Sequence, residues 1–182
     1  MDLRVDLLAY NDLLEHRALE RVTLVVFHCT ELPTLALARE YAERVLYPSG
    51  TGNSGHLYVD RDGAVIQYVS LDRVAHHVRN ENHHTVGIEV VNTGRYPHWG
   101  RTDGQAMTEP YTEAQHAACE ALLGWLAEQL PRLEGLARHS ELDTARVPAE
   151  DDPSRTVARK VDPGPRFDWE RMQRCWRALQ TE

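Results

Sequence analysis

The chain has 182 residues, which is the length of one domain, and it can bury a sizeable core without disulfide bonds. Its formal net charge of −8 argues against a broad electrostatic hold on nucleic acid or anionic membranes, so we expect no nucleic-acid partner. The longest apolar run, residues 22–27, is far too short to cross a bilayer, and we expect no membrane insertion.

The first residues and the cysteine spacing indicate in which cellular compartment the protein is expected. The first nine residues, MDLRVDLLA, carry charges where a secretory signal would need an apolar segment. The three cysteines are spread along the chain without a CxxC spacing, which suits a reducing environment. We therefore expect a cytoplasmic protein, with a phage-released or otherwise exported form left open. The oligomeric state is also left open.

The first half of the chain predicts mainly β structure. Residues 3–21 mix apolar and charged side chains and predict a weak helix or an irregular lead-in. Four further elements are expected in this half: a buried strand over 22–27, a helix over 34–45, a loop over 47–55, and a hairpin with strands over 56–59 and 64–69. The hairpin prediction depends on the Asp-Gly pair in its turn.

The second half predicts one more strand and two helices. The expected elements are a polar, His-rich segment over 73–84, a strand over 86–91, a loop over 92–109, a helix from 113 to about 130, an extended loop over 141–159 and a helix over 169–180. Thr112 and Gln115 form a capping box, and Asp168 can cap the last helix. Pro148 and Pro153 argue against regular structure in the extended loop. The expected fold is a single α+β (mixed α/β) domain over 1–182, with a central mixed β-sheet flanked by helices.

Candidate catalytic residues stand where predicted strands end or in a stiff turn. His28 follows the first strand, His139 follows a strand-like run, and Asp162 precedes a Pro-Gly-Pro turn. Together they would form a zinc site that leaves a position for water, whose pKa zinc lowers to about 7. Glu89, inside the strand over 86–91, could act as general base, and Lys160 could stabilise an oxyanion. The spacing alone supports this site weakly, because no short motif such as HExxH is present.

Six short segments add to this interpretation. In chain order they are VVFH (25–28), GHLYVDRDG (55–63), IQYV (66–69), VGIE (86–89), RHS (138–140) and KVDPGPRF (160–167). In this order they resemble the zinc-dependent N-acetylmuramoyl-L-alanine amidases, which include AmpD-type amidases, phage T7-type lysozymes and peptidoglycan recognition proteins. The resemblance covers about residues 22–169.

The resemblance implies a function and a set of site residues. It implies hydrolysis of the amide between N-acetylmuramic acid, or its anhydro form, and L-alanine of a peptidoglycan stem peptide. It also implies that His28, His139 and Asp162 bind zinc and that Glu89 and Lys160 assist. A residue matching His77 lies close to the substrate groove in the family, so we expect His77, and less directly Asn92, to contact peptidoglycan or muropeptide. Gly55 replaces a tyrosine of the T7-type enzymes, which favours the type that uses a glutamate.

Two other functions remain open at this point. One is a non-catalytic peptidoglycan-binding module, although such members typically lack a metal ligand and this chain has all three. The other is a metal-free cysteine hydrolase that uses Cys29 beside His28. Adjacent residues of a strand point to opposite faces, so we expect Cys29 to lie in the core instead. Trp99 is compatible with sugar stacking or with ordinary loop packing.

The form of the substrate also remains open. Soluble anhydro-muropeptides and the intact wall both fit the resemblance. The loop over 141–159 connects two expected zinc ligands, and loops longer than about 12 to 15 residues in a compact domain are usually functional or disordered. We therefore expect this loop to influence which substrate can enter the site.

Overall fold

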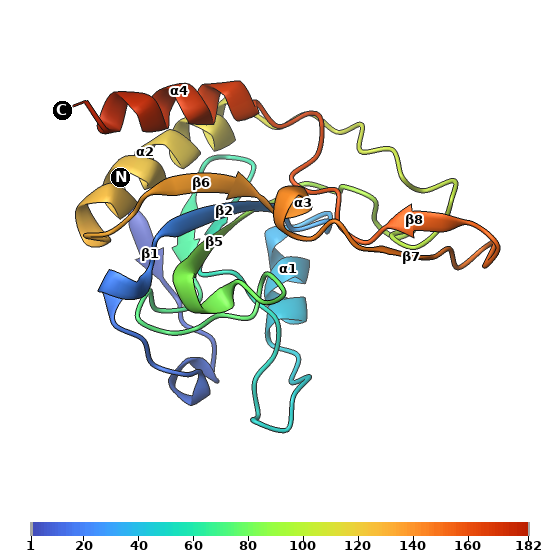
Figure 1. Ribbon diagram of the computed structural model, residues 1–182, viewed down its shortest axis with the longest axis horizontal. Helices are drawn as coiled ribbons and strands as arrows, with labels where there is room; N and C mark the ends of the chain where they lie inside the picture. The colour runs from blue at the N-terminus through green and yellow to red at the C-terminus, as the bar shows by residue number, and fades with distance from the viewer. Residues whose placement is uncertain (1, 182) are drawn as a thin grey trace.

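The computed structural model describes residues 2–181 and shows a six-stranded sheet with helices against both of its faces (Figure 1). The strands, in their spatial order, are β1 (Leu3–Val5), β4 (Val65–Gln67), β3 (Leu57–Val59), β5 (Thr85–Val90), β2 (Leu24–Cys29) and β6 (Gly135–Arg138). β3 and β4 pair antiparallel, and the other neighbours pair parallel. The expected central mixed sheet is confirmed.

Four α-helices accompany the sheet in the described chain. They are α1 (Leu35–Ala42), α2 (Glu113–Gln129), the single turn α3 (His139–Leu142) and α4 (Trp169–Leu179). Thr112 and Gln115 form the expected capping box at the start of α2, and Asp168 accepts a hydrogen bond from the Arg171 backbone at the start of α4. Within residues 2–181, no helix has both the length and the apolar character needed to cross a bilayer.

The two central strands, β2 and β5, carry different side chains on their two faces. Phe27 and Ile88 point into the main hydrophobic core, where α2 and α4 supply buried residues such as Leu122. His28 and Glu89 are paired across β2 and β5 and lie on the opposite face. The alternation of the strands therefore places Phe27 and Ile88 in the main core and brings His28 and Glu89 together on the opposite face.

Residues 3–21 differ from the expectation of a weak helix. They form the edge strand β1, which pairs with β4, and two short 3₁₀ turns at Asn11–Leu13 and Leu19–Arg21. The pairing partner of β1 lies about sixty residues away in the chain. The sequence of residues 3–21 alone therefore does not predict this pairing.

The segment over 141–159 is also more regular than expected. It contains a two-stranded hairpin of β7 (Arg146–Pro148) and β8 (Thr156–Ala158), which projects from the sheet beside the segment 93–109 (Figure 1). Pro148 is tolerated because it ends its strand in a ribbon whose two strands are both edges. The prediction of an extended loop without regular structure was therefore wrong for these two strands.

Candidate metal centre

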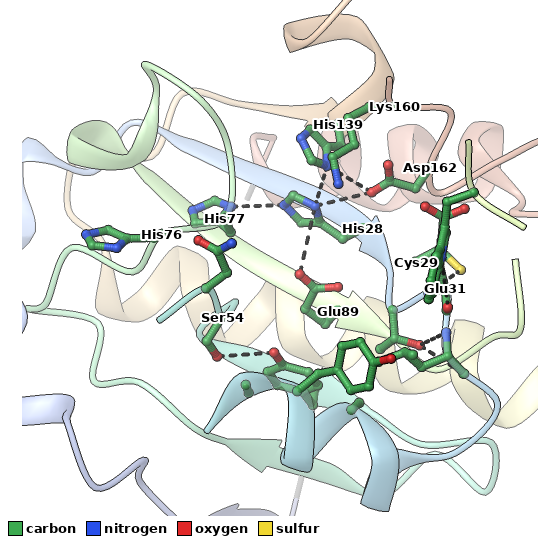
Figure 2. A pocket seen from close by; sticks show the side chains of 18 of the residues that line it. His28, Cys29, Glu31, Ser54, His76, His77, Glu89, His139, Lys160 and Asp162 are labelled. Carbon is green, nitrogen blue, oxygen red and sulfur yellow. Dashed lines mark hydrogen bonds and ion pairs between the residues drawn. The ribbon is translucent and has the colours of Figure 1, made fainter. Parts of the chain in front are cut away.

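Three elements bring His28, His139 and Asp162 together at one end of the sheet (Figure 2). His28 lies near the end of β2. β6 pairs with β2 and ends at Arg138, so His139, the first residue of α3, emerges next to His28. The backbone N–H of Ser140 donates to the carbonyl oxygen of Asp162 at 3.0 Å, which ties the Asp162 turn to α3.

The three side chains point their potential ligand atoms at one another. The distance is 2.9 Å between His28 Nδ1 and His139 Nδ1, 3.0 Å between His139 Nδ1 and Asp162 Oδ2, and 3.3 Å between His28 Nδ1 and Asp162 Oδ2. All three residues are at most 2% exposed. His139 Nε2 and Asp162 Oδ1 are also buried and have no hydrogen-bond partner within the described chain.

This donor set fits a tetrahedral divalent cation. Zinc accepts imidazole nitrogen and carboxylate oxygen at about 2.0–2.2 Å, which separates neighbouring ligand atoms by about 3.3 Å. The measured separations lie at or slightly below that value. Burial, and secondarily His139, lowers the pKa of His28 to about 4, so this ring is neutral. Burial opposes ionisation of Asp162, but its contacts with His139 and His28 hold its pKa well below the usual range.

Glu89 faces this cluster from β5. Its Oε1 lies 3.9 Å from His28 Nδ1 (Figure 2). Burial, and secondarily the Asp162 carboxylate, raises the pKa of Glu89 to about 8, so this carboxyl group can hold a proton near neutral pH. Gly55 leaves the room for it, because a Cβ at that position would lie 2.6 Å from Glu89 Cγ. A tyrosine at position 55 is therefore incompatible with this placement of Glu89.

Lys160 and the cluster line one pocket of about 540 Å³. Lys160 lies two residues before Asp162, and its charge lowers the pKa of both Asp162 and Glu89. The backbone just before Lys160 is held by Arg95, whose guanidinium donates to the carbonyl oxygens of Ala158 at 3.0 Å and Arg159 at 3.2 Å.

Arg95 is itself fixed by a buried ion pair that the sequence did not indicate. Its Nε lies 2.6 Å from Glu31 Oε1 and its Nη2 lies 2.9 Å from Glu31 Oε2. The two residues are 64 positions apart, in two irregular segments, so no motif could have revealed the pair. Trp99 donates its indole N–H to the carbonyl oxygen of Glu31 and packs against Tyr96, which gives it a loop-packing role at the pocket wall.

The two residues expected to contact substrate differ in their placement. His77 lines the pocket, but both of its ring nitrogens already lie within hydrogen-bond distance of His28 and Thr85. Asn92 is 2% exposed and is not among the pocket-lining residues. Its amide donates to the Glu109 carbonyl and accepts from the Gly94 N–H, so Asn92 would have to release both groups to reach a substrate.

Cys29 has the properties of a core residue rather than a nucleophile. Its side chain is buried in the main core, on the opposite face from His28, and lies within hydrogen-bond distance of the Asn92 carbonyl. Burial raises the pKa of the Cys29 thiol far above its ordinary value. A thiolate is the reactive form, so this environment disfavours a cysteine hydrolase.

Comparison of the sequence with curated proteins finds amidases among its relatives. The chain is 29% identical over 127 residues to the 1,6-anhydro-N-acetylmuramyl-L-alanine amidase AmpD of Enterobacter cloacae, an alignment that covers 65% of this chain and 54% of that protein. The chain thus spans about half the length of the curated relatives it matches.

Solved structures share the fold. A crystal structure of an AmpD derivative superposes with a TM-score of 0.64 at 23% identity, covering 97% of this chain and 93% of that one. The Escherichia coli amidase AmiD, in complex with anhydro-N-acetylmuramic acid-L-Ala-D-γ-Glu-L-Lys, has a TM-score of 0.64 at 20% identity, covering 85% of this chain and 57% of that one. The sequence profile of the N-acetylmuramoyl-L-alanine amidase family matches residues 18–165, and the chain therefore belongs to this family.

Proposed function

We propose that the protein is a zinc-dependent N-acetylmuramoyl-L-alanine amidase built on one domain over 1–182. Its reaction is hydrolysis of the amide between N-acetylmuramic acid, or its anhydro form, and the L-alanine of a stem peptide. The observation that carries the proposal is the buried convergence of His28 Nδ1, His139 Nδ1 and Asp162 Oδ2 in the pocket that Glu89 also lines. Membership of the family supports it.

The roles of the residues follow from their positions. His28, His139 and Asp162 would hold the zinc ion, which when bound supplies a Lewis acid and lowers the pKa of water to about 7. Glu89 accepts a proton from the attacking water and passes it to the leaving amine nitrogen. Burial of Glu89 favours its protonated form, which helps it to keep the proton between these two steps. The Lys160 ammonium group stabilises the negative charge that develops on the carbonyl oxygen.

The proposal also covers the substrate, the location of the protein and the residues that contact the substrate. Peptidoglycan-derived muropeptides are the proposed substrates, which agrees with the ligand in the AmiD complex. Cys29, Cys119 and Cys175 are all free thiols, which supports a cytoplasmic location. His77 and Asn92 stay the proposed residues for substrate contact only if substrate binding rearranges their present hydrogen bonds.

The decisive experiment measures zinc and products on the same sample. Elemental analysis of the purified protein should give about one zinc per chain, from the single site proposed. Mass spectrometry should show cleavage at the lactyl–L-alanine amide when soluble anhydro-muropeptides and intact sacculi are supplied side by side. His139→Ala should lose both zinc and activity, whereas His83→Ala, at an exposed histidine, should keep both.

Three results would contradict the proposal. A His139→Ala protein with full zinc and activity would disprove the ligand assignment. Zinc binding without cleavage of either substrate would overturn the amidase activity. Cleavage that resists chelators would point to metal-free chemistry.

A further inference from the structure

The feature that leads beyond the proposed reaction is a chain of polar groups behind His28. The nitrogen of His28 that faces away from the cluster, Nε2, lies 2.9 Å from His77 Nδ1 (Figure 2). The other nitrogen of His77, Nε2, lies 3.1 Å from Thr85 Oγ1. Thr85 Oγ1 in turn donates to the carbonyl oxygen of Glu81 at 2.9 Å.

The Glu81 carbonyl oxygen, at the end of this series of hydrogen bonds, sets the direction of every hydrogen bond in the series. A carbonyl oxygen only accepts, so the single hydroxyl proton of Thr85 is used on Glu81. Thr85 Oγ1 can then only accept from His77, which places a proton on His77 Nε2. A neutral imidazole carries one proton, so a His77 ring that is protonated on Nε2 has a lone pair on Nδ1, the atom that faces His28 Nε2.

The same logic continues to His28. His77 Nδ1 accepts, so His28 Nε2 carries the proton of this ring. A neutral His28 then has a bare Nδ1, and that atom is the one that points at His139 and Asp162. The tautomer of His28 is thus decided three hydrogen bonds away, at the backbone carbonyl of Glu81.

The ring of His77 is held in place from two sides, by Asn82 and by the strand β5. The side-chain oxygen of Asn82 accepts from the backbone N–H groups of His77 and Val78, at 3.0 and 2.8 Å. On the strand side, Gly87 of β5 leaves space for the ring, because a Cβ there would lie 2.7 Å from His77 Nδ1. Thr85 is fully buried, so water does not compete for its hydroxyl.

We propose that His77 and Thr85 are positioning residues that fix the tautomer and ring orientation of His28, so that its Nδ1 is presented ready to bind the metal ion. This inference rests on the proposed function, because it assumes that the cluster holds a metal. Hydrogen-bond partners behind a ligand histidine raise its basicity and hold its orientation, and their removal typically weakens metal binding about 10- to 100-fold.

Substitutions that keep or remove individual hydrogen bonds test the proposal through zinc affinity. The measurement is the zinc dissociation constant, by competition with a chromophoric chelator, for protein whose fold is verified by circular dichroism. His77→Phe keeps a ring but loses the acceptor, and should weaken zinc binding about 10- to 100-fold. His77→Asn places an oxygen near the position of Nδ1 and should restore much of the affinity.

Thr85→Val should weaken zinc binding, and Thr85→Ser, which keeps the hydroxyl, should not. His83→Phe, a change to an exposed histidine of the same segment, is the control.

A second measurement needs neither a variant nor zinc. Long-range ¹H–¹⁵N correlation spectra of the metal-free wild-type protein report which ring nitrogen of His28 and of His77 carries the proton. We expect Nε2–H for both rings, and in Thr85→Val a mixture of tautomers for His77.

The outcomes separate this inference from the proposed function. Nδ1–H on His28 in the metal-free protein, or zinc affinity of His77→Phe within three-fold of wild type, would overturn the positioning role. A His77→Phe protein with a raised KM for muropeptide and unchanged zinc affinity would assign His77 to substrate contact instead. Absence of zinc binding by the wild-type protein would overturn the proposed function, and the tautomers would still be measurable.

Discussion

Glu89 is the side chain whose chemical state the surrounding protein controls most directly. It is paired with His28 across β2 and β5, and on its other side Tyr58 of β3 is its neighbour in the sheet. A carboxyl group between buried neighbours keeps a proton more readily than one in water. This environment suits a group that must accept a proton in one step and return it in the next.

Replacement of this carboxyl group should separate catalysis from metal binding. Glu89→Gln keeps the size of the side chain but removes its basic oxygen, so turnover should fall by about 10² to 10⁴. Zinc content should stay at the wild-type level, because Glu89 is not one of the proposed ligands. Steady-state kinetics and elemental analysis check the two parts, and activity within a few-fold of wild type would refute the role of Glu89.

Gly55 provides a second test of the placement of Glu89. A methyl group at position 55 would meet Glu89 Cγ at 2.6 Å, so Gly55→Ala must displace the carboxylate. A misplacement of about 1 Å can cost about 10²-fold in rate, and kcat should fall by that order. Gly124→Ala is the matched control, because its Cβ would meet no atom closer than 3.9 Å. In α2 this change should raise the free energy of unfolding by about 0.5–1 kcal/mol and leave kcat unchanged. Equal kinetics of the two variants would contradict the argument.

At the scale of elements, the β7–β8 hairpin is hydrogen-bonded to the segment 93–109, which supplies Arg95 and Trp99 to the lining of the pocket. The backbone N–H of Thr102 and its hydroxyl both donate to the Asp151 carboxylate at 2.8 Å. The backbone N–H of Glu150 donates to the carbonyl oxygen of Gly100 at 2.9 Å. The hairpin and the segment 93–109 thus supply hydrogen-bond partners to each other, and each is held by the other.

Shortening the hairpin should change which substrate is preferred. Residues 149–155 can be replaced by Asn-Gly, which suits a two-residue turn between paired strands, and this removes both partners of the segment 93–109. Without these contacts the segment that carries Arg95 and Trp99 is less firmly held, so the pocket should open more easily. Activity on intact sacculi should then rise relative to activity on soluble muropeptides, and zinc content should not change. Product yields from the two substrates, measured in parallel, check this. An unchanged ratio with zinc retained would leave the hairpin without a role in substrate choice.

At the scale of the whole molecule, the Glu31–Arg95 ion pair joins three parts of the chain. Glu31 follows β2, Arg95 follows β5, and the guanidinium also reaches the carbonyl oxygens of Ala158 and Arg159 next to Lys160. Both side chains are almost fully buried. The pair thus fixes the segments that surround the pocket relative to the sheet.

Removal of one partner of this pair should be costly. Arg95→Met leaves the Glu31 carboxylate buried without compensation and should lower the free energy of unfolding by about 3–5 kcal/mol. The double variant with Glu31→Leu removes that charge, so its loss should be smaller than the sum of the two single losses by about 1–3 kcal/mol. Urea denaturation of the four proteins provides the cycle, and strict additivity would show that the pair is not coupled.

Much of the architecture was predictable from local signals. The apolar runs of β2 and β5, the turn of the β3–β4 hairpin, and the capping residues Thr112 and Asp168 each act within a few residues of the chain. Such signals are readable because strand alternation and helix capping depend on neighbours in sequence. Five candidate site residues could be singled out in the same way: His28, Glu89, His139, Lys160 and Asp162. The prediction that they form one site depended on the order of six short segments along the chain.

The remainder depended on contacts between distant segments. β1 is a strand only because β4 lies beside it, and β7 and β8 are strands only because they pair with each other. The Glu31–Arg95 pair and the hydrogen bonds from Thr85 through His77 to His28 join positions that no sequence spacing relates. Residue types and local periodicity determine which side chains are available, whereas strand order and burial decide which of them meet, because only the packed chain brings distant donors and acceptors within about 3 Å.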